Sequence, residues 1–302
     1  MRIGVVGTGV IASSWSALFL SHGAEVVLLG RSDESLRRAS ERIESYLDFL
    51  RDHGMIKQMG KLRLTEDIEE LRDAELIEEC VVEDLELKRK IFSELEEVCR
   101  KETILASSTS GLSITEIQRV LKNPERSIVT HPINPPHLIP LIEIVPGERT
   151  EKSTVERAKE IMESFSRVPV VLKKEVPGFI VNRLAAALWR EAIDLVVKGV
   201  ASVEDVDRVV SFGPGLRWAF MGPFMIYHLG GGEGGIRHFI EHLGGAFSKW
   251  WSTMECWTEL TEEMKKKIIK GTEEEIGERD FRELERERDE MLVKLLKLRG
   301  LI

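Results

Sequence analysis

The sequence predicts an α/β fold in which a doubly wound sheet is followed by a smaller all-helical domain. Three observations predict this class. The chain starts with a short apolar run, a glycine-rich turn and a helical pattern. Segments typical of strands and of helices then alternate through the first half. After Val176-Pro177-Gly178 no segment has the pattern of a strand. We therefore expect two domains, residues 1–177 and residues 178–302.

The N-terminal turn, residues 7–12, has the pattern of a dinucleotide-binding site. It follows the apolar run Arg2–Val6 and opens a helix over residues 10–21. Gly7 permits a tight turn, Gly9 lets the backbone approach a pyrophosphate, and Ala12 lets the helix pack closely on the strand. The free N–H groups and the positive dipole end of the helix then favour phosphate. We predict a Rossmann-type domain whose cofactor contacts include Gly7, Gly9, Val10 and Ile11.

The remaining elements follow from short apolar runs and from apolar residues at helical spacing. The expected strands comprise residues 25–29, 76–80, 103–106, 127–130, 141–145 and 168–172. The expected helices comprise residues 85–99, 114–121 and 154–165, and then 179–197, 202–211 and 279–298. Ser113 is a candidate cap for one helix, and Ser202 with Asp205 resembles a capping box. The alternation in the first half predicts right-handed crossovers.

The end of the second strand bears on the choice of cofactor. Folds of this kind place an acidic residue there to bind the ribose 2′-hydroxyl of NAD. This chain has Gly30-Arg31-Ser32 instead. Without the carboxylate a 2′-phosphate is not repelled, and Arg31 and Ser32 supply a charge and a donor for it. We therefore expect NADP to be favoured over NAD. The alternative is that Asp33 or Glu34 reaches the ribose.

Four residues carry the chemistry of alcohol oxidation. Ser110 and His131 follow two neighbouring strands, Glu143 lies on another strand, and Asn182 begins the helical domain. Ligands bind beyond the carboxyl ends of the strands in such a sheet, so we expect these residues to converge. A neutral His131 would take the hydroxyl proton, and Glu143 would fix its tautomer. Ser110 and Asn182 would hydrogen-bond the substrate oxygen.

Each of these residues also has a structural alternative. His131 alone could be a satisfied structural histidine, Glu143 could occupy an edge position, and serine-rich loops often cap helices. Only the occurrence of all four residues together favours the catalytic interpretation.

Composition limits the remaining possibilities. The chain has 302 residues, 42% of them hydrophobic and 31% charged, which is enough for two domains with cores of their own. Its net charge of −9 and lack of a basic stripe argue against nucleic acid as a partner. No apolar run is long enough to span a membrane, and no signal peptide is visible. The three cysteines are unclustered, which favours a reducing cytoplasm. We assign no metal ligands.

Several segments resemble the 3-hydroxyacyl-CoA dehydrogenase family. They surround the four residues above and comprise residues 108–110, 131–136, 141–145 and 177–183. Within the family the chain is most similar to the branch of lambda-crystallin and L-gulonate 3-dehydrogenase. Residues 10–15, 79–88, 134–136 and 215–223 carry that similarity. The resemblance covers essentially the whole chain.

The resemblance implies roles for particular residues. It makes His131 the base, Glu143 its partner, and Ser110 and Asn182 ligands of the substrate oxygen. It places Glu83 and Lys88 near the nicotinamide half of the cofactor, and Arg217 near a substrate carboxylate or phosphate. It also implies a homodimer that forms through the helical domain.

The sequence therefore predicts an NAD(P)-dependent dehydrogenase of a small 3-hydroxy carboxylate, either gulonate-like or carnitine-like. The shorter, mixed-charge segment at residues 51–75 disfavours acyl-CoA, although Lys57 and Lys61 leave an L-3-hydroxyacyl-CoA dehydrogenase open. The alternative from another class is a non-catalytic, crystallin-like protein that binds the cofactor.

Overall fold

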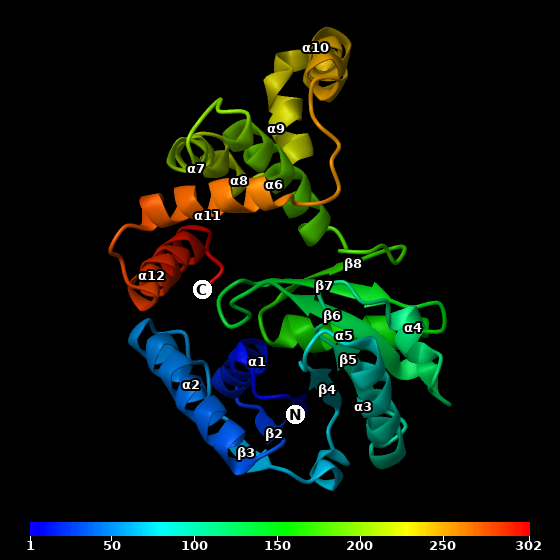
Figure 1. The fold of residues 1–302 in the computed structure, drawn as a ribbon. Helices are drawn as coiled ribbons and strands as arrows, with labels where there is room; N and C mark the ends of the chain where they lie inside the picture. Colours follow the sequence, from blue (N-terminus) through cyan, green and yellow to red (C-terminus); the bar gives the residue numbers. More distant parts are fainter. The chain divides into compact units, whose positions relative to one another are not determined.

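A computed structural model describes residues 1–302 as two compact units, Met1–Arg183 and Leu184–Ile302. Figure 1 shows a sheet with its covering helices in the first unit, and helices alone in the second. The predicted fold class, a doubly wound sheet followed by a helical domain, is confirmed. No helix combines the length and the apolar composition that a membrane span requires.

The first unit is built on an eight-stranded sheet. The strands are β1 (Arg2–Val6), β2 (Glu25–Leu29), β3 (Lys61–Thr65), β4 (Leu76–Glu79), β5 (Ile104–Ser107), β6 (Ser127–Pro132), β7 (Leu141–Pro146) and β8 (Val168–Val171). Their order is β3-β2-β1-β4-β5-β6-β7-β8. All neighbours pair in parallel except β6 and β7, which pair antiparallel with His131 opposite Glu143. The strand order reverses at β1, where such sheets bind their ligands.

Helices cover both faces of this sheet (Figure 1). One face packs against α1 (Val10–Ser21), α2 (Asp33–Asp52) and α5 (Lys152–Ser164). The other packs against α3 (Leu85–Val98) and α4 (Ile114–Gln118). The short 3-10 helices η1 (Ile68–Leu71) and η2 (Pro124–Arg126) lie in connections. Ser113 caps α4 as predicted, because its Oγ accepts the N–H of Glu116 over 3.2 Å.

Besides the two short 3-10 helices, one helix and one strand of this unit were not predicted. The helix α2 is rich in charge, yet its buried residues recur at helical spacing, from Leu36 through Ala39, Ile43 and Leu47 to Leu50. The strand β3 is a short edge strand with three of its five residues exposed, and its polar–apolar alternation includes only two apolar residues, Leu62 and Leu64, which is a weak signal for a strand.

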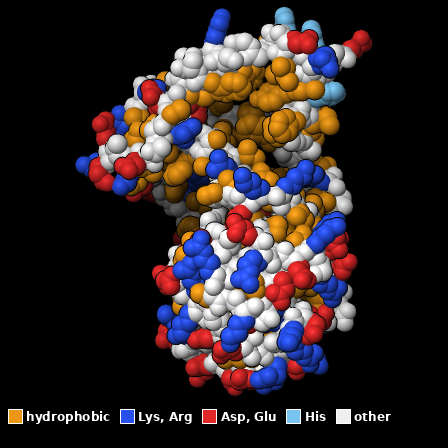
Figure 2. Space-filling model, turned by 90° about the vertical axis from the view of Figure 1, so that its right-hand side faces the viewer, with side chains coloured by type: hydrophobic (Ala, Val, Ile, Leu, Met, Phe, Trp, Pro, Cys, Tyr) orange, Lys and Arg blue, Asp and Glu red, His pale blue; other side chains and the backbone are white.

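The second unit contains only helices. They are α6 (Val181–Val197, whose first turn lies in the first unit), α7 (Val203–Phe212), α8 (Pro214–Trp218), α9 (Pro223–Gly230), η3 (Gly232–Gly234), α10 (Gly235–Trp251), α11 (Glu262–Ile276) and α12 (Phe281–Leu298). The predicted capping box of Ser202 and Asp205 is present at the start of α7. Large apolar side chains gather on the surface of this unit (Figure 2).

Candidate active site

The turn between β1 and α1 is shaped to hold a pyrophosphate. Gly7 has a φ of +114°, and a Cβ there would lie 2.9 Å from the carbonyl oxygen of Cys80. Gly9 faces open space, with no atom within 4 Å of where a Cβ would be. No side chain caps α1, and its first turn has no acidic residue. Its first N–H groups are therefore free to bind phosphate, which fits a dinucleotide cofactor.

The residues after β2 leave no room for a side chain at position 30. The N–H of Gly30 donates to the carbonyl of Thr65 over 3.0 Å. A Cβ on Gly30 would lie 2.7 Å from Leu36 and 2.9 Å from Thr8. Arg31 is exposed, and its guanidinium has no partner in the chain. Ser32 caps α2, since its Oγ accepts the N–H of Ser35 over 3.3 Å. The hydroxyl proton of Ser32 is not used by that bond.

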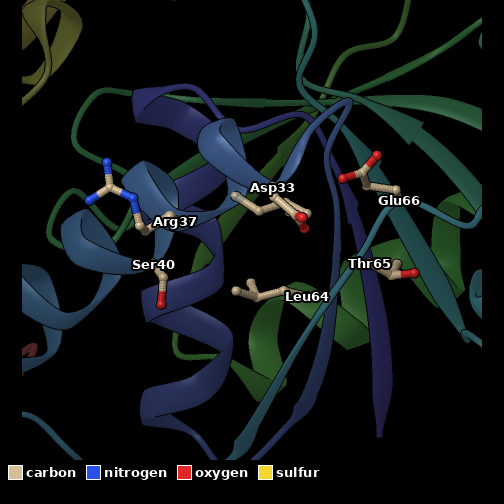
Figure 3. A pocket seen from close by; sticks show the side chains of 7 residues that line it. Asp33, Arg37, Ser40, Leu64, Thr65 and Glu66 are labelled. Carbon is tan, nitrogen blue, oxygen red and sulfur yellow. The ribbon is translucent and has the colours of Figure 1, made fainter.

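A pocket of about 510 Å³ lies beside Gly30, between α2 and the end of β3 (Figure 3). Its lining residues are Asp33, Leu36, Arg37, Ser40, Leu64, Thr65 and Glu66. Arg37 is paired with Glu41 at 2.5 Å. The carboxylates of Asp33 and Glu66 have no such partner, so the pocket carries negative charge next to the ribose end of the expected cofactor site.

His131 and Glu143 form a buried pair on neighbouring strands. The Nδ1 atom of His131 lies 2.8 Å from Oε2 of Glu143, and both side chains are almost fully buried. Since a carboxylate can only accept, Nδ1 carries the proton and Nε2 is left as a proton acceptor. Glu143 does not occupy an edge position, because β7 lies between β6 and β8.

The other oxygen of Glu143 is held by the backbone at the start of α6. Its Oε1 accepts the N–H groups of Ile180 and Val181 over 2.8 and 3.0 Å. These donors, at the positive end of the helix, satisfy the second oxygen of this buried side chain. Phe179 is buried in the sheet unit and its ring lies 5.3 Å from that of His131. The start of α6 and the residues just before it therefore contact the pair of His131 and Glu143 directly.

Ser110 and Asn182 are in direct contact with each other. The Nδ2 atom of Asn182 donates to the backbone carbonyl of Ser110 over 2.8 Å. The Ser110 side chain is exposed and its hydroxyl has no protein partner. The Ser110 hydroxyl and the second amide proton of Asn182 thus remain available to a ligand.

Glu83 fixes the loop that carries Ser110. Its Oε1 accepts the N–H groups of Ser110 and Gly111 over 3.1 and 3.2 Å, and also the hydroxyl of Thr109. Lys88 lies behind it, buried, with its Nζ 2.8 Å from Glu79 and 3.7 Å from Glu83. The structure therefore places Lys88 in an ion pair that supports Glu83.

Sequence reasoning assigned no role to Glu78 and Glu79. Both side chains are fully buried at the end of β4, and they point to opposite faces of the sheet. Glu79 binds Lys88 and accepts the hydroxyl of Ser107 over 2.7 Å. Two adjacent carboxylates inside an apolar strand were the available signal, because buried charges require partners.

Arg217 belongs to the second unit, where it is exposed in the last turn of α8. The residues described above all belong to the first unit.

Comparisons with known proteins identify the family of the chain. The sequence model of the 3-hydroxyacyl-CoA dehydrogenase NAD-binding domain matches residues 2–176, and that of the C-terminal domain matches residues 178–271. An L-carnitine dehydrogenase of Oceanobacillus iheyensis is 43% identical over 98% of this chain and 97% of its own length. An L-carnitine dehydrogenase of Bacillus cereus is 39% identical over 98% of this chain and 92% of its own length.

Solved structures of dehydrogenases are also similar. The NAD⁺-dependent 5-formyl-3-hydroxy-2-methylpyridine 4-carboxylic acid 5-dehydrogenase has a TM-score of 0.85 and 28% identity, covering 98% of this chain and 97% of its own. A 3-hydroxyacyl-CoA dehydrogenase from Archaeoglobus fulgidus has a TM-score of 0.67 and 28% identity, with full coverage of both chains. The predicted family is confirmed, whereas the lambda-crystallin branch stays a prediction. The protein is a nicotinamide-dependent dehydrogenase acting on a CH–OH group, and it belongs to the 3-hydroxyacyl-CoA dehydrogenase family.

Proposed function

We propose that the enzyme oxidises the 3-hydroxyl of a small, carnitine-like 3-hydroxy carboxylate to the 3-keto product. The observation that carries this proposal is the buried pair of His131 and Glu143, with Nε2 of His131 left to accept a proton. The relatives named L-carnitine dehydrogenase support the substrate class.

The proposed roles follow from the geometry. Nε2 of His131 takes the hydroxyl proton of the substrate, and Glu143 stabilises the imidazolium that forms. Ser110 and Asn182 donate hydrogen bonds to the substrate oxygen as it becomes a carbonyl. The nicotinamide ring, when bound, accepts the hydride. We further propose that Arg217 binds the substrate carboxylate, since an exposed guanidinium without a partner suits that group.

The substrate is tested by measuring kcat/KM with L-carnitine, L-gulonate and 3-hydroxybutyryl-CoA, each with NAD and with NADP. We expect L-carnitine to give the highest value. A higher value with the CoA thioester would assign the chain to acyl-CoA oxidation. Turnover of none of the three, with tight cofactor binding, would favour a non-catalytic cofactor-binding protein.

We propose that NADP is favoured over NAD. Gly30 leaves no carboxylate at the end of β2, and the unpartnered Arg31 and the Ser32 hydroxyl can bind a 2′-phosphate. The alternative is that Asp33 or Glu66, whose carboxylates line the neighbouring pocket, accepts a ribose hydroxyl, which would favour NAD.

Two variants separate these cofactor preferences. Arg31→Ala should raise the KM for NADP by about tenfold or more and leave that for NAD nearly unchanged. Asp33→Asn is the matched control, and it should leave both values nearly unchanged. A wild-type preference for NAD that Asp33→Asn abolishes would overturn the proposal.

We propose that the helical domain, taken as residues 178–302, mediates a homodimer. Its surface exposes large apolar side chains, including Phe212 and Phe224, which are 78% and 83% exposed. A second copy of the chain would remove such surface from water. Light scattering should give twice the mass of one chain, and Phe224→Asp should shift the protein toward monomer while Lys297→Ala does not. A monomeric wild type would contradict the proposal.

We also propose the cytoplasm as the location of the enzyme. The three cysteines, Cys80, Cys99 and Cys256, are free thiols, as expected in a reducing compartment. Cell fractionation with an antibody to the chain tests this.

A further inference from the structure

Glu78 joins the two strand ends that carry Ser110 and His131. Thr130, the residue before His131 on β6, has its Oγ1 2.7 and 2.8 Å from the two carboxyl oxygens of Glu78. Ser108, two residues before Ser110, donates its hydroxyl to Oε2 of Glu78 over 3.1 Å. Because side chains alternate along a strand, this group lies on the opposite face of the sheet from Glu79, outside the reacting centre.

The number of protons available for hydrogen bonds around Glu78 indicates whether its carboxyl group is protonated. The Thr130 hydroxyl has one proton but lies close to both carboxyl oxygens, so a proton on Glu78 would fill the second contact. Ser108 cannot accept that proton. Its Oγ already accepts Nε1–H of Trp15 over 2.9 Å and the thiol of Cys80 over 3.4 Å. A neutral carboxylic acid therefore satisfies the whole set.

The surroundings of Glu78 agree with this state. Burial raises the pKa of Glu78 to about 8, and the neighbouring charge of Glu79 acts in the same direction. Its side-chain partners are uncharged, namely the hydroxyls of Ser108, directly after β5, and of Thr130 on β6. The indole of Trp15 on α1, which donates to Ser108, is uncharged as well. Burial also raises the pKa of the Cys80 thiol well above its ordinary value, so this thiol adds no charge.

We propose that Glu78, as a neutral carboxylic acid, is a positioning residue that holds the strand ends of Ser110 and His131 at the separation that proton transfer requires. When Glu78 ionises, the Thr130 hydroxyl keeps only one of its two bonds to the carboxyl group. The two strand ends then lose part of their connection, and a small displacement of reacting groups lowers the rate strongly. This proposal rests on the proposed function only in that kcat is measured with the proposed substrate.

Glu78→Gln and Glu78→Ala test the proposal. The amide of glutamine is uncharged and can both donate to and accept from Thr130, so Glu78→Gln should keep kcat at neutral pH within about twofold. The wild-type kcat should fall as Glu78 ionises at about pH 8, and that of Glu78→Gln should not. Glu78→Ala should lower kcat by about tenfold or more with the cofactor KM nearly unchanged. An equal alkaline fall in Glu78→Gln, or an unchanged kcat in Glu78→Ala, overturns the proposal.

Two further measurements cover other outcomes. If Glu78→Ala does not fold, Thr130→Val removes the partner hydroxyl at nearly constant volume and should lower kcat in the same way; an unchanged kcat overturns the proposal. Infrared spectra should show a carboxylic acid band at neutral pH that disappears at about pH 8 and is missing in Glu78→Gln. Absence of that band overturns the proposal. The band needs no substrate, so its presence without turnover would count against the proposed function alone.

Discussion

The side-chain amide of Asn182 donates to the backbone carbonyl of Ser110 over 2.8 Å. Two residues that the sequence predicts as ligands of one substrate oxygen are thus fixed relative to each other before any substrate binds. Since the bond uses the backbone of Ser110, it survives any change of the serine side chain. This arrangement lowers the entropy that is lost when the substrate is oriented.

Replacing His131, the proposed base, should abolish most of the activity. His131→Ala should lower kcat by at least about two orders of magnitude, because no other group in the pair can take the hydroxyl proton. Cofactor binding, measured by fluorescence titration, should be nearly unchanged. His53→Ala, a histidine outside the site, is the control. Full activity of His131→Ala would show that His131 is not the base.

Glu143→Gln should invert the tautomer of His131. The amide group would still accept the N–H groups of Ile180 and Val181, but its NH₂ would face Nδ1 of His131. The proton would then move to Nε2, which could no longer act as base. We expect kcat to fall by about 10²-fold or more. Nitrogen NMR of the imidazole checks the tautomer, and an unchanged tautomer with full activity would contradict this assignment.

Ser110→Ala and Asn182→Ala should differ in their effect on stability. Ser110→Ala removes a hydroxyl without a protein partner, so the free energy of unfolding should stay the same while kcat/KM falls about tenfold. Asn182→Ala also removes the bond to the Ser110 carbonyl, and it should cost about 1 kcal/mol of stability in addition. Urea unfolding and steady-state kinetics measure both. Equal stability of the two variants would show that the Asn182 bond contributes nothing.

Glu78 should make the stability of the fold depend on pH. Its pKa is about 8 in the folded chain and has the ordinary value of 4.5 when unfolded. The folded state therefore binds the proton more tightly. The resulting stabilisation is complete below about pH 4.5 and is lost as the pH rises through about 8. As the pH rises from about 4.5 to about 8, the free energy of unfolding of Glu78→Gln should therefore increase by a few kcal/mol relative to that of the wild type. Urea unfolding measures this difference in free energy at about pH 4.5 and at about pH 8. The same difference at both pH values would contradict the raised pKa of Glu78.

The sequence predicted the site best where a functional residue lies at the end of an expected strand. The turn at Gly7 and the pair of His131 and Glu143 follow from strand ends and residue type, and the structure places the pair in contact. The helix α2 and the strand β3 were not predicted, since α2 hides its apolar stripe among charges and β3 is a short edge strand.

The partners of the buried carboxylates could not be predicted for a different reason. Glu79 meets Lys88 across nine positions, and Glu78 meets Thr130 across 52, so both contacts depend on the packing of strands and helices. The donors to Glu143 are backbone N–H groups, which every residue except proline has, so the residue types at these positions do not predict the contact. Arg217 lies in the second unit, and its role in substrate binding stays a prediction.

The hydrogen bonds from the backbone of Ile180 and Val181 to Glu143 limit where the chain can be cut into separate domains. The first family domain ends at residue 176, whereas these donors lie beyond it. A fragment cut at that border would keep Ser110, His131 and Glu143 but leave one oxygen of a buried carboxylate without its donors. Such a fragment would resemble a complete cofactor domain in sequence and yet carry a weakened base. Exchange of cofactor domains between relatives should therefore be made within α6, after Asn182, and not at the apparent border.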